Sequence, residues 1–301
     1  MTSLRKRRID VQITLNPVTD NATGKVTQPT FSRSGKNTVT LSGYRCQAWI
    51  RKEGYISQNP LTLRMFGLPL DLMNEIATLG RIPMAGRNNT VTVSAGDDVD
   101  GVAVAYTGTI ILAWANFQAM PDVAFEIVAQ TGAYAALAAA EPTSFRGSAD
   151  VATVISGIAT RMGRGFQNNG VQARLADPYF PGTLLDQLNA CVEAAGIEKE
   201  DTGESIVIWP RGGSRNGVVP LVSANTGMIG YPAFTHSGIA LTTLYNPAIG
   251  RGQMIKVESD LKPAEGTWRV FTITHVLESD VPNGEWSTYL EAAEPAYAPV
   301  R

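Results

Sequence analysis

The feature that most constrains this chain is a set of strand-like patterns that occurs twice, in the same order, in its two halves. The pairs are TVTVS at 90–94 with MIKVE at 254–258, YTGTIILAW at 106–114 with WRVFTITHV at 268–276, and VAFEIVA at 123–129 with WSTYLEA at 286–292. Their separations are nearly constant, at 164, 162 and 163 residues (90 to 254, 106 to 268, 123 to 286). Because alternation of apolar and polar residues fits a strand with one buried face, we expect two copies of one β module, each a small barrel or sandwich.

A fourth pattern extends the repeat toward the N-terminal side of each copy. LTLRMFGL at 61–68 precedes the first set as LTTLYNPA at 241–248 precedes the second, with a larger separation because the first copy carries an extra helix at 68–80. In that helix Leu72, Met73 and Ile76 share one face, Pro69 suits an early helical position and Gly80 a C-terminal stop. Closing each antiparallel sheet would remove its exposed edges.

The region between the two copies has helical rather than strand periodicity. In SADVATVISGIATRMG the apolar residues recur at helical spacing, with Ser148 or Asp150 to cap the start and Gly163 to end the helix. GTLLDQLNACVEAAG repeats the pattern, with Thr183 as N-cap and Gly196 as the stop. The strand ESIVIWP follows, so a small α/β unit is predicted between the β regions.

These patterns together predict a β-rich α+β protein made of two similar small β-barrel modules of the tube type with an inserted α/β domain. The first module is expected at 1–145, including the helix at 68–80. The α/β domain is expected at 146–211, and the second module with a C-terminal tail at 212–301.

Composition excludes several classes of protein. Hydrophobic residues make up 44% of the chain and charged residues 17%, which is enough to bury a core. A net charge of -2 gives no general attraction to nucleic acid or anionic membrane. The two cysteines, Cys46 and Cys191, are far apart and fit a reducing compartment, with Cys191 on an apolar helical stripe and therefore expected in the core. The N-terminal segment has no leader pattern, and the Ala-rich stretch that ends at Pro142 is too short to span a membrane, so synthesis and folding in the cytoplasm are expected.

Candidates for catalysis or metal binding are few. His236 and His275 are the only histidines; His275 stands in an alternating strand, and neither cysteine has a second cysteine at metal-binding spacing. GRGFQNNG and RGGSRNG are rich in glycine but match no nucleotide-binding loop and are interpreted as turns. No catalytic, cofactor-binding or metal-binding residue is therefore predicted, and no enzymatic activity is expected.

Three charged clusters leave alternatives open. Asp97, Asp98 and Asp100 fit a solvated hairpin turn better than a calcium loop, since Val102 breaks the ligand pattern. Glu198 with Asp201 or Glu204 could supply paired carboxylates of a glycosidase, although the stretch EKEDTGE is interpreted as a polar loop. The basic run Arg5, Lys6, Arg7 and Arg8 could bind phosphate, and a frayed, solvated N-terminus is the simpler interpretation.

One series of stretches runs in order through nearly the whole chain: TVTVSAG, YTGTIILAW, VISGIATRMGRGFQNNG, GTLLDQLNACVEAAGI, IVIWP, ANTGMIGYPAFTHSGIALTTLYNP and GTWRVFTITHVLESDVPNGEWSTYLEA. With this series the chain resembles the central baseplate hub proteins of contractile phage tails, which are related in fold to the N-terminal module of type VI secretion spike proteins. The basic N-terminus and the tail EPAYAPVR carry none of the resemblance.

The resemblance makes residues 222–257 the entry to the second barrel. Backbone turns that other residues resist are then expected at Gly227, Gly230 and Gly238. Cover for a strand edge or for a neighbouring molecule is expected from Tyr231, Pro232 and Phe234. His236 lies among them and is incidental in this interpretation.

The resemblance also implies a mechanism, which the internal repeat supports. Three copies of a chain with two similar barrels present six similar barrels around one axis, which matches a hexameric tail tube while keeping threefold symmetry for a trimeric spike. The implied protein is a structural symmetry adaptor of the virion, made in the host cytoplasm, without cofactors and without specific nucleic-acid binding.

The implied partners are the other copies of the homotrimer, the tail tube protein, the central spike protein and other baseplate proteins, with the tape measure protein as a further candidate. Two alternatives stay open: the tail-tip hub of a non-contractile phage and a tail-associated peptidoglycan hydrolase. The hydrolase would need a carboxylate pair or a metal site in a cleft.

Overall fold

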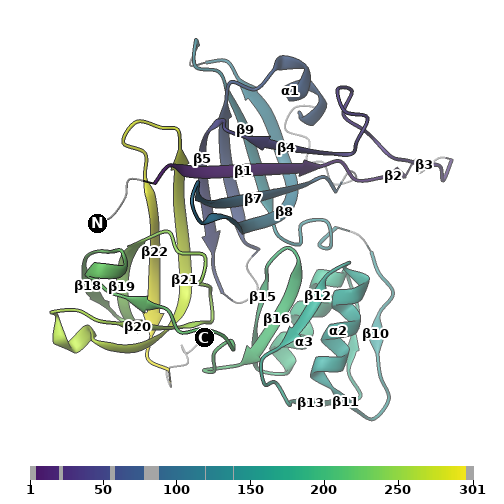
Figure 1. The fold of residues 1–301 in the computed structure, drawn as a ribbon. Coiled ribbons are helices and arrows are strands. Elements are labelled where there is room, and N and C mark those ends of the chain that lie inside the picture. Colours follow the sequence, from purple (N-terminus) through teal and green to yellow (C-terminus); the bar gives the residue numbers. More distant parts are fainter. Residues whose placement is uncertain are drawn as a thin grey trace. The chain divides into compact units, whose positions relative to one another are not determined.

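The structure is a computed structural model that describes residues 5–19, 23–54, 58–77, 88–118, 120–137 and 139–295 (Figure 1). The chain divides into two compact units. Unit 1 consists of Met1–Ile50, Pro60–Tyr134 and His275–Trp286. Unit 2 consists of Arg51–Asn59, Ala135–Thr274 and Ser287–Arg301. Each unit is therefore assembled from segments that are far apart in the sequence.

Unit 1 is a β structure with one short helix, α1 (Leu70–Ile76). Its strands are β1 (Arg7–Thr14), β2 (Val18–Thr19), β3 (Val26–Thr27), β4 (Thr38–Ser42), β5 (Arg45–Lys52), β6 (Pro60–Phe66), β7 (Thr90–Asp97), β8 (Gly101–Asn116) and β9 (Ala124–Gln130). β21 (Gly266–Ser279) adds its residues from His275 onward. The strand order is β21–β5–β6–β9–β8–β7–β1–β4, and each pairing from β5 to β4 is antiparallel.

Alternating burial along these strands creates the core of unit 1. On β7 the side chains of Val91, Val93 and Ala95 are fully buried, while their sequence neighbours are partly exposed, as expected for a strand with one inward face. β8 is unusually long because it pairs with β7 through residues 101–109 and with β9 through residues 109–116. One strand thus connects two parts of the sheet.

Helix α1 has the face that the sequence predicts but is shorter. Leu72, Met73 and Ile76 are buried, as expected. The helix ends at Ile76 with Ala77 as its C-cap, and Pro69 is the N-cap residue rather than a helical one. Pro69 has no N–H to contribute to the first turn, so the cap position suits it equally well. The stop expected at Gly80 lies outside the described residues.

The N-terminal part of unit 2 is an α/β structure in which two helices lie side by side against a three-stranded sheet (Figure 1). The helices are α2 (Val151–Arg161) and α3 (Leu184–Ala194). The sheet has the order β12 (Gly165–Asn168), β16 (Ser205–Pro210) and β15 (Ile197–Asp201). Two small ladders pair β10 (Thr143–Ser144) with β14 (Tyr179–Phe180) and β11 (Ser148–Asp150) with β13 (Arg174–Ala176).

The predicted helix boundaries in this part are confirmed at their caps. Asp150 accepts a hydrogen bond from the backbone N–H of Thr153 at 2.9 Å and begins α2. Thr183 and Asp186 form a reciprocal capping box at the start of α3. Gly163 and Gly196 follow the two helices with φ of 70° and 62°, a conformation that favours glycine.

The C-terminal part of unit 2 is a second set of strands. These are β17 (Leu221–Val222), β18 (Met228–Thr235), β19 (Gly238–Leu244), β20 (Met254–Val257), β21 as far as Thr274 and β22 (Trp286–Ala293). The first residue of β22, Trp286, is assigned to unit 1. Two short 3₁₀ turns, η1 (Ala224–Thr226) and η2 (Lys262–Ala264), connect them. The order is β18–β19–β22–β21–β20–β17, with β17 parallel to β20.

The two strand sets correspond strand for strand. β6 pairs with β9, β9 with β8 and β8 with β7; likewise β19 pairs with β22, β22 lies beside β21 and β21 pairs with β20. β5 lies outside β6 as β18 lies outside β19. The sequence patterns at 106–114 and 268–276 therefore lie on strands with equivalent places. Buried residues match as well: Ile127 on β9 and Leu290 on β22 are both interior.

The structure corrects the expectation of closed barrels. Within the described residues both strand orders run from one end strand to another without a pairing that joins the ends, so the antiparallel sheet is present and barrel closure is not. Closure would need a ladder between β4 and β21 in unit 1, or between β18 and β17 in unit 2. The three-domain division at 145/146 and 211/212 stays a prediction.

Candidate assembly surfaces

The two histidines lie in unlike surroundings. His236 is in the turn between β18 and β19. His275 is on β21 with only 2% of its surface exposed, so it is an interior residue and not the surface side chain of a sheet face. Among the residues that the structure describes, no group of three or more His, Cys, Asp or Glu side chains is placed to hold a metal ion.

Both cysteines are core residues. Cys46 on β5 and Cys191 on α3 have no exposed surface, which confirms the prediction for Cys191. Burial raises the pKa of each thiol to about 12. Since the thiolate is the reactive form, neither side chain is prepared for nucleophilic chemistry or for ligation.

The basic run at the N-terminus is folded and paired. Arg7 and Arg8 are the first residues of β1. Arg7 donates to the backbone carbonyl of Gly284 at 2.6 Å, and Lys6 lies 3.2 Å from the carboxylate of Asp280. A frayed terminus is therefore wrong for Arg7 and Arg8, which lie in β1. The chain itself supplies acceptors for the basic side chains, and phosphate binding by them stays an untested alternative.

The acidic residues of the turn after β7 pair with the N-terminal Arg5, a contact that the sequence alone does not reveal. Asp97 begins the turn between β7 and β8, and the backbone N–H groups of Asp100 and Val99 hold the pKa of its carboxyl below the ordinary value. Arg5 donates to Asp97 at 3.1 Å and also pairs with Asp100. The hairpin-turn interpretation is confirmed, and the turn clasps the N-terminal arginine.

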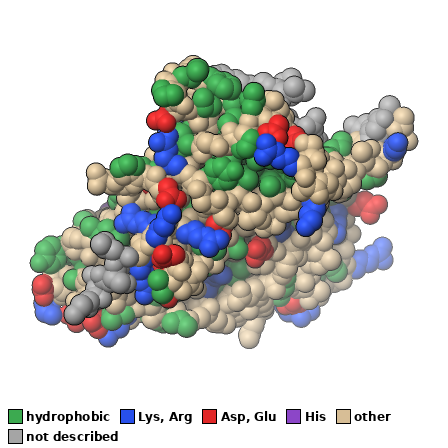
Figure 2. All heavy atoms as spheres, turned by 45° about the horizontal axis from the view of Figure 1, so that its top comes forward, with side chains coloured by type: hydrophobic (Ala, Val, Ile, Leu, Met, Phe, Trp, Pro, Cys, Tyr) green, Lys and Arg blue, Asp and Glu red, His purple; other side chains and the backbone are tan. Residues whose placement is uncertain are grey.

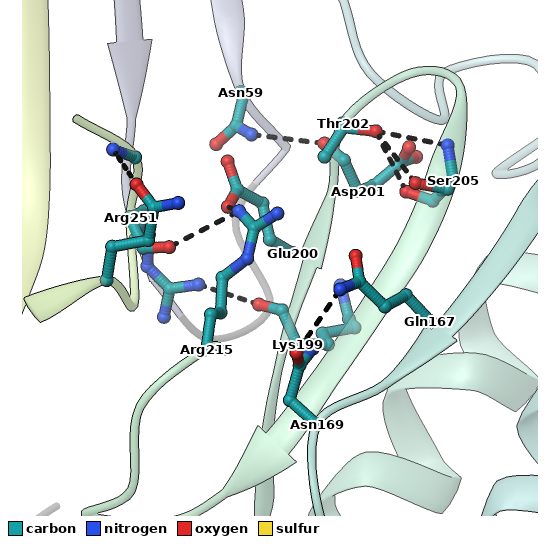
Figure 3. A network of polar contacts seen from close by, with 12 residues as sticks. Asn59, Gln167, Asn169, Lys199, Glu200, Asp201, Thr202, Ser205, Arg215 and Arg251 are labelled. Carbon is teal, nitrogen blue, oxygen red and sulfur yellow. Dashed lines mark hydrogen bonds and ion pairs between the residues drawn. The ribbon is translucent and has the colours of Figure 1, made fainter. Parts of the chain in front are cut away.

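Unit 2 contains a network of buried charges around β15 (Figure 3). EKEDTGE is not the polar loop that was expected: its first part is strand β15, on which Lys199, Glu200 and Asp201 are almost fully buried. Glu200 accepts from Arg215 at 2.8 Å. Burial lowers the pKa of Lys199 to about 8.

Glu198 ties this strand to the second strand set within unit 2. Its carboxylate accepts from Arg269 on β21 at 2.9 Å and from Arg251 at 3.3 Å. Arg251 also donates to the backbone carbonyl of Lys199 at 2.7 Å (Figure 3). Its guanidinium lies 5.1 Å from the ring centroid of Trp209. Both arginines are at most 3% exposed.

Of the carboxylates considered for a glycosidase, Glu198 and Asp201 have structural partners, and Glu204 is exposed between β15 and β16. Glu198 neutralises two buried arginines, and Asp201 caps its own turn by accepting from the backbone N–H of Gly203 at 2.7 Å. A general acid must stay protonated near neutral pH in an apolar pocket, whereas Glu198 faces two guanidinium groups. This arrangement stabilises the junction of β15 and β21 rather than a reaction.

The most exposed apolar side chains of unit 2 include three on β18. Ile229, Tyr231 and Phe234 are 47%, 68% and 57% exposed, and β18 is the end strand of its set. The strand has a bulge between Ile229 and Ala233, and Pro232 inside it is buried. Tyr231 and Phe234 are exposed on this end strand and Pro232 is not, so the role of all three as cover for an edge or a neighbouring molecule stays a prediction.

Glycines allow the chain to enter and leave this edge. Gly227 and Gly230 have φ of 108° and 72°, a region that favours glycine. At Gly238, with φ of 146°, a Cβ would collide with the backbone carbonyl oxygen of Ala292. The three positions predicted from the sequence as glycine turns are therefore confirmed.

Equivalent faces of the two strand sets carry different chemistry. On the first set a shallow hollow is lined by Arg45, Gln47, Arg64, Asn116 and Glu126, among others. Arg45 lies over the ring of Phe66, with 3.8 Å from Cζ to the ring centroid. On the second set a hollow is lined mostly by hydroxyl-bearing and aliphatic residues, with one arginine and one glutamate at 51 and 291; the hydroxyl-bearing ones are Tyr231, Thr242, Thr272, Thr274 and Tyr289.

Charges on the surface are mixed. On the face shown in Figure 2, Lys and Arg side chains alternate with Asp and Glu, and hydrophobic side chains gather between them. A single-sign field of the kind that attracts nucleic acid does not develop on this face. None of the helices in the described part of the chain has the length and apolarity that crossing a bilayer demands.

A family model described as "Baseplate hub gp41" matches residues 30–282. The chain belongs to this family. Membership makes it a component of a phage tail baseplate and places it among structural tail proteins, which fits the expectation of a protein without enzymatic activity. No significant match is found among curated proteins.

Solved structures show the same fold at low sequence identity. A tail protein from Neisseria meningitidis is similar with a TM-score of 0.57 and 10% identity, over 97% of this chain and 99% of that one. The 43 kDa tail protein of prophage MuSo2 from Shewanella oneidensis has a TM-score of 0.56 and 10% identity, over 94% and 97%. An Escherichia coli type VI secretion component, described as similar to the T4 tail proteins gp27 and gp5, has a TM-score of 0.58 and 12% identity, over 86% and 77%.

Proposed function

We propose that this hub chain forms a homotrimer whose six strand sets build a pseudo-sixfold ring between a hexameric tail tube and a trimeric central spike. The observation that carries the proposal is the strand-for-strand correspondence of β5–β9 with β18–β22. Three copies with two equivalent sets give six, which matches six tube subunits one to one. A dimer would give four and a hexamer twelve.

The partners in this proposal follow from the same geometry. The tail tube protein meets the ring on one side, and the spike meets it on the other with threefold symmetry. Structural neighbours include a Francisella PdpA-VgrG complex, with a TM-score of 0.57 over the whole of this chain and 60% of that one. This likeness concerns fold, and it supports a spike protein as the partner to test first. Other baseplate proteins and the tape measure protein complete the set.

Contractile tails are the proposed setting, with the tail tip of a non-contractile phage as the alternative. The exposed aromatic residues of β18 and the mixed surface charge support a protein that works through broad contacts with other proteins. An obligate ring of this kind should bury more than about 2,000 Å² at its interfaces in total. The function is located in these surfaces and not in a pocket.

Electron microscopy of assembled tails tests the proposal. We expect three copies of the chain around the tail axis, with the two strand sets of each copy in six equivalent places. Six copies that contribute one set each to the ring, or one copy off the axis, would overturn the adaptor mechanism. The mass of the free chain is a weaker test, because the ring can require tube or spike protein to form.

A further inference from the structure

The free edge of β18 is the most distinctive unpartnered surface of unit 2. β18 ends the strand order, and within the described residues no strand lies against its outer side. Tyr231 and Phe234 project from it with more than half of their surfaces exposed. Aromatic residues with this exposure are typical anchors of protein interfaces.

The corresponding strand of unit 1, β5, has its outer side occupied. The residues of β21 from His275 onward lie next to β5 in the strand order of unit 1. Gln47 on β5 donates from its side-chain amide to the carboxylate of Glu278 on β21 at 2.7 Å. The structure therefore shows what covers this place in one of the two strand sets.

The strand correspondence identifies the strand that should lie against β18, as β21 lies against β5. In the first set the strand that corresponds to β21 is β8, since each lies between the pair β9 and β7 or β22 and β20. β8 of the same chain belongs to unit 1 and serves its own sheet, so a second copy must supply the strand. Its C-terminal end and the segment that follows carry matching apolar surface: Trp114 on β8 is 36% exposed, and Phe117 and Met120 after the strand are 50% and 71% exposed.

We infer that β18 of one copy docks against the C-terminal end of β8 in the next copy, head to tail, and that three such contacts close the trimer. The inference rests on the proposed function. Pro232 has no N–H to donate and the bulge interrupts the strand, so a long shared ladder is disfavoured. The contact depends instead on Tyr231 and Phe234 packing against Trp114 and Phe117.

Incorporation into tails tests the anchor. Phe234→Asp places a charge in the proposed contact, and we expect its incorporation, in competition with the wild-type chain, to fall about 30-fold, as for an interface anchor. Val26→Asp is the matched control, because Val26 is 62% exposed on β3. Thermal unfolding of both variants checks that they fold. Equal incorporation of folded Phe234→Asp and Val26→Asp would overturn the inference.

Cysteine cross-linking in assembled tails tests the same contact without weakening it. The native thiols are buried and unreactive, so Phe234→Cys combined with Trp114→Cys gives a specific pair. A bismaleimide should produce a ladder that ends at three chains, and neither single variant should do so. Threefold particles without such cross-links would overturn only the docking of β18 on β8. Particles without threefold arrangement would overturn the proposed function itself.

Discussion

The two strand sets of this chain have the same order but unlike margins. In the first set β7 is flanked by the eight-residue strand β1 in antiparallel register, whereas in the second β20 is flanked by the two-residue strand β17 in parallel. β5 is covered by β21 in unit 1, whereas β18 is an open end strand. The shared part is therefore the inner four-strand sequence of each set, and the differences lie at the edges.

The exposed faces of the two sets also differ, in the chemistry of their side chains. Arginines stacked on aromatic rings and paired with carboxylates mark the first, and threonines with tyrosines mark the second. The interior alternation is common to both, since it fixes which side of each strand is buried. The comparison indicates that this fold preserves its core pattern while its margins and faces are free to serve different partners.

A second difference lies at one register position. Thr109 is opposite Thr90, the first residue of β7, and Arg269 is opposite Met254, the first residue of β20. Arg269 reaches Glu198 on β15. The second set is thereby fastened to the α/β part of unit 2 by a buried ion pair, at a place where the first set has a threonine.

The largest expected effect comes from breaking this ion pair. Glu198→Gln removes the negative charge between two buried guanidinium groups, and we expect a loss of about 3–5 kcal/mol in the free energy of unfolding. Urea denaturation measures the loss, and hydrogen exchange should show it first on β20 and β21 rather than on β7 and β8. A loss shared equally by both strand sets would contradict a role confined to unit 2.

The matched control is an exposed ion pair of the same unit. Lys262 and Glu265 lie 3.0 Å apart with side chains that are 77% and 44% exposed. Lys262→Gln should change the free energy of unfolding by less than about 1 kcal/mol. If both variants had equal effects, burial would not be the reason for the cost.

Equivalent core truncations give the next largest effect. Ile127→Ala on β9 and Leu290→Ala on β22 remove buried side chains from corresponding positions, and we expect each to cost about 3 kcal/mol. Urea midpoints, with the slopes compared to the wild type, measure both. A large cost at one position and none at the other would break the equivalence of the two sets.

Elements with a local signal in the sequence could be predicted. Alternation identified β7, β8, β20 and β21, because a strand with one buried face requires it. Capping residues identified the start of α3 at Thr183 and narrowed the start of α2 to Ser148 or Asp150, of which Asp150 is the cap, since the cap and the first turn are neighbours in sequence.

What depends on distant pairing could not be predicted. Arg5 and Asp97 are far apart in sequence, so each cluster alone looked solvated. Glu198 and Arg269 likewise meet only in the fold, and a run of charges carries no sign that it will be a buried strand. The prediction of barrel closure failed for a related reason. Alternation shows that a segment is a strand, but it does not show whether the first and last strands of a sheet pair with each other.

An effect of similar size is expected from pH. The pKa of Lys199 is lowered from 10.5 to about 8 by burial, so between these values the unfolded chain binds more protons than the folded one. Stability should therefore rise with pH across this window, by up to about 3 kcal/mol, and the penalty should be fully present below pH 8. Thermal unfolding of Lys199→Met against the wild type at pH 7 and pH 10 measures the difference. The variant should be the more stable one at pH 7 and should lose this advantage at pH 10.

The smallest effect is expected at His236, and it separates the two histidines. His236 is in the turn between β18 and β19 and is exposed, next to the edge proposed to contact a second copy. If only the aromatic side chains of β18 form that contact, His236→Ala should change the free energy of unfolding by less than about 0.5 kcal/mol and leave incorporation into tails intact. His275→Ala is the comparison, because His275 is interior and its loss leaves a cavity that should cost more than 1 kcal/mol. Denaturation and tail assembly measured on both variants decide the matter: a folded His236→Ala chain that fails to assemble would show that the turn, and not only the strand edge, belongs to the interface.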